Sequence, residues 1–157
     1  MDQERFERVW QRVRSGREGA ATAQPGSERE RLERLIVREE RIEARYRRLR
    51  VRGSGSCRRE AELGAREAEK RLNDLQAEYF LRYGDNYRAV WLPLPEAPGV
   101  LTALREIYLE ETQGAAAYRE TAETDQEEGV RRRCLLYAEE RERRAAAVRR
   151  LIAGAIR

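Results

Sequence analysis

The chain has 157 residues, enough for one domain around a single hydrophobic core. Its 33 basic and 29 acidic residues leave a net charge of +4, and because the two signs are interleaved we expect salt-bridged helix surfaces and no nucleic-acid binding. The chain has no histidine, which excludes histidine-dependent triads, a histidine general base and imidazole-ligated zinc or iron.

Residues 1–26 are predicted to form a short helix followed by a linker. Phe6, Val9, Trp10 and Val13 stand at i, i+3, i+4 and i+7, so they share one apolar face of a helix that covers the core. The segment 15–27 contains glycines, Pro25 and small residues, a composition typical of a flexible linker.

Residues 27–157 are predicted to form an all-α, antiparallel four-helix bundle. Apolar residues at helical spacing predict helices over 27–51, 57–83, 100–124 and 126–156. Ser27 is a good N-cap for the first of these helices, and Gly84 is a good C′ residue for the second. The short Gly-Ser-Gly turn at 53–55 makes the first two helices antiparallel neighbours.

The connection 84–99 is predicted to cross the length of the bundle. It contains Pro93, Pro95 and Pro98, so it cannot be helical throughout, and it is longer than the ~2–8 residues usual between bundle helices. At ~3.3 Å per residue it can span a long helix, which favours a bundle with one long crossover over a simple up-down-up-down bundle. We expect Trp91 to anchor it.

The two halves of the bundle resemble each other at an offset of about 72 residues. The first predicted helix carries Leu35-Ile36 and Glu39, with Tyr46 seven residues later. The third repeats the pattern as Ile107-Tyr108, Glu111 and Tyr118. Seven residues make two helical turns, so each glutamate shares the buried face of its helix with its tyrosine.

The second and fourth predicted helices place arginines on their inward faces. Arg71 lies on the apolar stripe of the second helix, and Arg141 and Arg144 lie on that of the fourth. An unpaired buried charge costs several kcal/mol, so these arginines need partners. Glu39 and Glu111, which face inward on the neighbouring helices, are the expected partners.

These motifs resemble the rubrerythrin-type proteins of the ferritin-like superfamily over nearly the whole chain. The resemblance lies in Phe6-Glu-Arg-Val-Trp-Gln-Arg-Val13, Leu35-Ile36-x-x-Glu39, the segment 75–84, the proline-bearing crossover and Tyr108-Leu-Glu-Glu111 with Tyr118. It implies a ferritin-like fold in which each half supplies one Glu from its first helix and a Glu-x-x-His from its second to a pair of metal ions.

The resemblance also implies which positions have lost the metal ligands. Glu39 and Glu111 match the first-helix ligands, and Tyr46 and Tyr118 match tyrosines near the metal site. The Glu-x-x-His motifs are replaced by Ala68-Glu-Lys-Arg71 and Arg141-Glu-Arg-Arg144, so the dimetal site is not expected to assemble.

We therefore expect guanidinium groups to take the place of the metal ions. In this hypothesis Arg71, Arg144 and in part Arg141 pair with Glu39 and Glu111, and the surplus Arg141 reaches solvent or Glu140. A structure with both glutamates more than about 4 Å from any arginine would remove the hypothesis.

The sequence leaves three functional classes open. The first is a non-catalytic structural or partner-binding protein, a homodimer without a cofactor. The second is a carboxylate-only iron or manganese oxidoreductase that uses Glu39, Glu111 and some of Glu67, Glu69, Glu140 and Glu142. The third, nucleic-acid binding through arginine clusters, is opposed by the interleaved acids.

The cellular location is expected to be the cytoplasm. Cys57 and Cys134 form no Cys-x-x-Cys pair and, without a signal peptide, are expected to be reduced thiols. No apolar run approaches the ~18 residues of a membrane span, so no membrane contact is expected.

Overall fold

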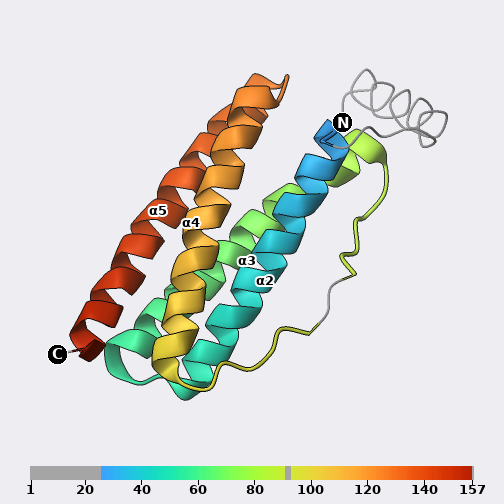
Figure 1. Cartoon of the computed structure of the whole chain (residues 1–157). Helices are drawn as coiled ribbons and strands as arrows, with labels where there is room; N and C mark the ends of the chain where they lie inside the picture. The colour runs from blue at the N-terminus through green and yellow to red at the C-terminus, as the bar shows by residue number, and fades with distance from the viewer. Residues whose placement is uncertain (1–25, 91–92, 157) are drawn as a thin grey trace.

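The computed structural model describes residues 26–90 and 93–156, and these residues form an antiparallel four-helix bundle (Figure 1). The helices are α2 (Glu28–Arg52), α3 (Gly55–Tyr83), α4 (Val100–Thr124) and α5 (Glu128–Ile156). The all-α bundle is therefore confirmed. The short helix expected at the N-terminus and the anchoring residue Trp91 lie outside the described residues.

The helix ends follow the capping residues that the sequence offers. The Ser27 side chain accepts a hydrogen bond from the backbone N–H of Glu30 at the start of α2. Gly84 ends α3 in the left-handed conformation at φ 70°, which only glycine adopts at little cost. The bounds agree with the predicted ones to within two residues, and those of α4 are the same.

The bundle consists of two helical hairpins, α2–α3 and α4–α5, joined by the connection 84–99 (Figure 1). The connection leaves the end of α3 and runs back along the bundle beside α2, so α4 begins at the opposite end from where α3 ended. As a result α4 is antiparallel to α2, and α5 is antiparallel to α3. The expected long crossover is present.

Arginines of α2 fasten this crossover. The Arg48 guanidinium donates to the carbonyl oxygen of Leu94 at 2.7 Å, and Arg52 donates to that of Ala97. Leu94 is buried against the bundle. These contacts satisfy carbonyl groups of the crossover, whose described residues form no helix or strand.

The apolar core is divided into two clusters by a layer of charged side chains. One cluster surrounds Leu35, Tyr79 and Tyr137, and the other surrounds Ile42, Leu104 and Val148. Between them, at mid-height on all four helices, lie Glu39, Arg71, Glu111 and Arg141. The layer is the candidate functional site.

Candidate functional site

Each helix contributes one ionisable side chain to the charged layer. Glu39 comes from α2, Arg71 from α3, Glu111 from α4 and Arg141 from α5, and none of them is more than 1% exposed. The apolar periodicity of each helix turns these positions inward together with its leucines and tyrosines. The prediction that both glutamates lie on buried stripes is confirmed.

Glu39 is held by two arginines and a tyrosine. Its Oε1 atom accepts hydrogen bonds from Arg71 Nε at 3.1 Å and from the Tyr118 hydroxyl at 2.7 Å. Arg141 Nη1 lies 3.3 Å from the same oxygen, an ion pair without hydrogen-bond geometry. The carboxylate is therefore compensated by positive charge from both α3 and α5.

Glu111, in the other hairpin, is held by one arginine and one tyrosine. Its Oε2 atom accepts from Arg141 Nε at 2.8 Å, and its Oε1 accepts from the Tyr46 hydroxyl at 2.6 Å. The tyrosines are thus crossed, because each donates to the glutamate of the helix in the other hairpin. These hydrogen bonds tie α2 to α4 through the centre of the bundle.

Arg141 occupies space that a glycine leaves open. A Cβ atom on Gly114 would lie 1.9 Å from Arg141 Nη1, so only glycine lets the guanidinium rest against α4. At the equivalent positions of the first half stand Ile42 and Ala68, both buried in the apolar cluster around Leu104 and Val148. In the α2–α3 hairpin the larger side chain of the pair, Ile42, is on the first helix, whereas in the α4–α5 hairpin the larger one, Arg141, is on the second helix.

The layer is incompletely satisfied by its own hydrogen bonds. Glu39 Oε2 and both Nη atoms of Arg141 are buried without a hydrogen-bond partner among the described residues. Buried donors and acceptors without partners reduce stability by about 1–3 kcal/mol each, and more when the group is charged. The ion pairs offset part of this loss, but the layer is a poor candidate for net stabilisation.

Burial and charge determine the protonation states in the layer. Burial would lower the pKa of Arg71 and of Arg141, but the carboxylates of Glu39 and Glu111 raise both instead, so both arginines are cationic. Burial and the neighbouring carboxylates raise the pKa of Tyr46 and of Tyr118 well above the ordinary tyrosine value. Both hydroxyls are therefore neutral donors at neutral pH.

The structure corrects the predicted roles of Arg141 and Arg144. Arg141, expected as the surplus residue near solvent or Glu140, is buried between Glu39 and Glu111. Arg144 reaches neither glutamate. It pairs with Glu67 of α3 at 2.6 Å and with Glu60. The gap at Gly114 explains the exchange, because it admits a guanidinium one turn before Arg144.

Two reciprocal ion pairs join α3 to α5 around the layer. Arg71 Nη1 of α3 lies 3.3 Å from Glu140 of α5, and Arg144 of α5 pairs with Glu67 of α3. The internal repeat relates these pairs, since Arg71 corresponds to Arg144 and Glu67 to Glu140. The two hairpins therefore meet through matched charges along this side.

The residues of the layer do not fit a pair of metal cations. The guanidinium groups of Arg71 and Arg141 lie against the carboxylates that would bind the cations. Within 26–90 and 93–156, no group of three or more Cys, Asp or Glu residues is placed to hold a metal ion.

The alternative carboxylate set is not brought together either. Glu67 and Glu140 are engaged by arginines, and Glu142 pairs with Arg119 at the surface of α4 and α5. Glu69 is exposed. A carboxylate-only metal site would require these side chains to abandon their present partners.

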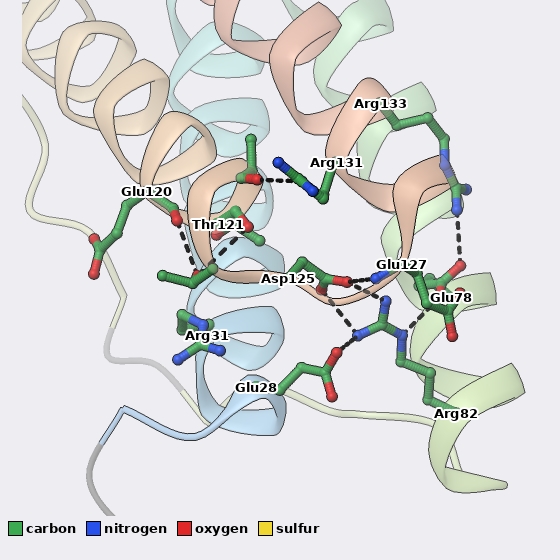
Figure 2. Close-up of polar contacts among 12 residues, drawn as sticks. Glu28, Arg31, Glu78, Arg82, Glu120, Thr121, Asp125, Glu127, Arg131 and Arg133 are labelled. Atoms are coloured by element: carbon green, nitrogen blue, oxygen red, sulfur yellow. Dashed lines mark hydrogen bonds and ion pairs between the residues drawn. The ribbon is translucent and has the colours of Figure 1, made fainter.

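A second ionic cluster, which the sequence reasoning missed, closes one end of the bundle (Figure 2). The Arg82 guanidinium donates to both Asp125 oxygens at 3.0 and 3.1 Å, to Glu78 at 2.7 Å and to Glu28. Arg133 donates to the other Glu78 oxygen at 2.8 Å. The cluster joins all four helices, because Glu28 is on α2, Glu78 and Arg82 are on α3, and Arg133 is on α5. Asp125, the C-cap residue of α4, supplies the fourth.

The sequence carries a partial signal for this cluster. Arg82 follows Glu78 at the i,i+4 spacing of a helical ion pair, and Asp125 stands at the predicted junction of two helices. Nothing in the spacing shows that a residue of α3 reaches the α4–α5 turn, because that contact depends on how the hairpins pack.

Comparisons with known proteins leave the family open. No protein-family model, no curated protein and no solved structure matches the chain. Among the described residues, no helix is long and apolar enough to cross a membrane. The described residues form an all-α four-helix bundle with a buried arginine–glutamate network.

Proposed function

We propose that this chain is a rubrerythrin-type, ferritin-like bundle in which arginine–glutamate pairs have replaced the dimetal centre. Its role is structural or partner-binding rather than catalytic, and it acts as a cytoplasmic homodimer. The observation that supports the proposal best is the charged layer. Two inward carboxylates, each with a crossed tyrosine, are matched by two buried guanidiniums.

The charge balance supports replacement of the cations. Carboxylates in a dimetal site neutralise and bridge cations, and they are strongly destabilising when buried without them. Here Glu39 and Glu111 are compensated by the fixed positive charges of Arg71 and Arg141. Arginine is suited to this place because its charge does not depend on pH in the physiological range.

Metal analysis of the purified protein tests the proposal directly. The protein should be grown in iron- and manganese-supplemented medium, reconstituted with each ion, desalted and measured by elemental mass spectrometry. The expected result is no stoichiometric metal and no change in thermal unfolding temperature. Two ions per chain, or oxygen consumption with ferrous iron that Glu39→Ala abolishes, would overturn it in favour of an oxidoreductase.

A variant with restored metal-binding motifs tests whether the charged layer derives from a dimetal centre. Ala68→Glu, Arg71→His, Arg141→Glu and Arg144→His together restore both Glu-x-x-His motifs. We expect this variant to bind manganese or iron and to unfold at a higher temperature with the metal than without it.

The matched control for this variant changes arginines that lie outside the layer. Arg66→His and Arg143→His introduce two histidines at exposed positions of the same two helices. We expect the control to bind no stoichiometric metal. A folded four-substitution variant that binds no more metal than this control would contradict the proposed origin of the layer.

The proposed dimer has its own test. Sedimentation velocity over a hundredfold range of protein concentration should show a species of twice the chain mass, 18.4 kDa. A single species of chain mass throughout this range would remove the homodimer from the proposal.

A further inference from the structure

Seven arginines form a continuous stripe along one side of α2. They follow one another at alternating spacings of three and four residues, which keeps them on one side of the helix. They are Arg31, Arg34, Arg38, Arg41, Arg45, Arg48 and Arg52.

The lower half of the stripe is fully used. Arg48 and Arg52 hold carbonyl oxygens of the crossover, and Arg45 pairs with Glu106 of α4 at 2.5 Å. Because these three guanidinium groups are engaged by the crossover and by α4, they are not free to contact a nucleic-acid backbone.

Further up, Arg38 is left without a partner. It makes no hydrogen bond or ion pair with any residue in the described part of the chain. Its neighbour Arg34 has only a distant contact, 3.8 Å, with Glu30. Arg41 pairs with Glu110 of α4 at 3.3 Å, while its Nε atom has no hydrogen-bond partner among the described residues.

These arginines border a groove of about 430 Å³ between α2 and α4. Arg34, Arg38 and Arg41 lie along α2, Glu110 and Gln113 along α4, and Tyr87 of the crossover closes one side. The volume falls within the range of about 300–1,000 Å³ typical of small-molecule sites.

The groove has one cationic donor and one carboxylate acceptor that lack hydrogen-bond partners among the described residues. Arg38 is a forked donor suited to a carboxylate. Glu110 is only 7% exposed, and its Oε2 atom has no hydrogen-bond partner in the described structure. An orphaned buried carboxylate oxygen is stabilised by a cationic donor.

The remaining acids at the groove are already engaged. Glu30 accepts from the backbone N–H of Gly26 at 2.8 Å, and Glu33 accepts from the Tyr79 hydroxyl at the same distance. They add negative charge to one side of the groove, which disfavours a polyanion such as a nucleotide triphosphate. A ligand without net charge is favoured.

We propose that this groove binds a small zwitterion, a free amino acid, with its carboxylate on Arg38 and its ammonium group toward Glu110. The site is independent of the charged layer and of any metal. This site gives the bundle a ligand-binding role in addition to the structural role proposed above.

A thermal-shift screen of the twenty standard L-amino acids, followed by calorimetric titration of the strongest binder, tests the proposal. Two analogues of that binder are titrated beside it: the same acid without its amino group and the same amine without its carboxylate. We expect the amino acid to bind at least about tenfold more tightly than either analogue.

Three variants locate the site, and circular dichroism checks that each is folded. Arg38→Gln should weaken binding about tenfold or more, whereas Arg66→Gln, which removes the same charge from an exposed position of α3, should leave it unchanged. Glu110→Gln should reduce the advantage of the amino acid over the analogue without an amine.

Other outcomes would overturn the proposal. No saturable binding of any of the twenty amino acids excludes the site, and equal weakening by Arg38→Gln and Arg66→Gln excludes the groove. Equal affinity for the amino acid and its amine-free analogue excludes a zwitterion and leaves a simple anion site.

Discussion

Arg141 is the residue on which the charged layer depends most. It bridges Glu111 and Glu39 and is wholly buried. Replacing it with methionine keeps much of the volume but leaves Glu111 without a compensating cation. We expect a loss of about 3–5 kcal/mol in the free energy of unfolding, measured by urea denaturation at pH 7.

A double variant separates lost charge from lost packing. In Arg141→Met with Glu111→Gln the uncompensated carboxylate is gone, so part of the lost stability should return. If the double variant is less stable than Arg141→Met alone, then the charge of Glu111 is not what Arg141 compensates.

Gly114 permits this position of Arg141. The Gly114→Ala substitution should destabilise the protein by about 1–3 kcal/mol, because the new methyl group overlaps the guanidinium. The control Gly129→Ala adds a methyl group in open space on α5 and should be neutral or stabilising. Equal effects of the two substitutions in urea denaturation would contradict the close approach.

At the scale of the elements, Asp125 fastens the α4–α5 turn to α3. Burial would raise the pKa of Asp125, but the hydrogen bonds from Arg82 and the Glu127 N–H hold it below its ordinary value. A lowered pKa in the folded state means that this stabilisation is present at neutral pH. It is lost as the pH falls below about 4.

The Asp125→Asn variant tests this assignment. It should be less stable than the wild type at pH 7, and the difference should shrink as the pH falls toward 3. Urea denaturation at both pH values measures it. A difference that does not depend on pH would show that the charge of Asp125 is not involved.

Contacts between the helices are of aromatic, apolar and charged kinds. Within the α4–α5 hairpin Tyr118 packs edge-on against Tyr137 at 5.5 Å. The two apolar clusters extend across both hairpins, and charged pairs also join α2 to α4 and α3 to α5. The hairpins are thus joined by groups whose geometry is specific, which selects one register of packing.

At the scale of the whole molecule, the crossed tyrosines predict cooperative alkaline unfolding. The pKa of Tyr46 and of Tyr118 is raised in the folded state. Their contribution is therefore fully present below the unfolded value of about 10 and is lost as the pH rises above it.

Absorbance at 295 nm and circular dichroism, followed together from pH 8 to 13, measure this behaviour. Exposed tyrosines should ionise first, and the last ones should ionise only as the helix signal disappears. In the Tyr46→Phe, Tyr118→Phe variant this late fraction should be smaller. Complete ionisation of the wild type with an intact helix signal would contradict the buried hydrogen bonds.

The sequence alone determined the four helices, the long crossover and the inward positions of Glu39, Glu111, Arg71 and Arg141. These features follow from helical periodicity, capping residues and proline, which act within a few residues of chain. The cost of an unpaired buried charge then requires a carboxylate partner for each inward arginine, but the sequence does not say which one.

Only the tertiary structure decided the partners. Arg141 rather than Arg144 enters the layer because Gly114, on another helix, leaves room for it. Arg82 meets Asp125, and Arg38 faces an open groove, because of the way the two hairpins pack against each other. Helical spacing determines which face of its helix a residue occupies, whereas its partner on another helix depends on how the helices pack and on the space that neighbouring side chains leave.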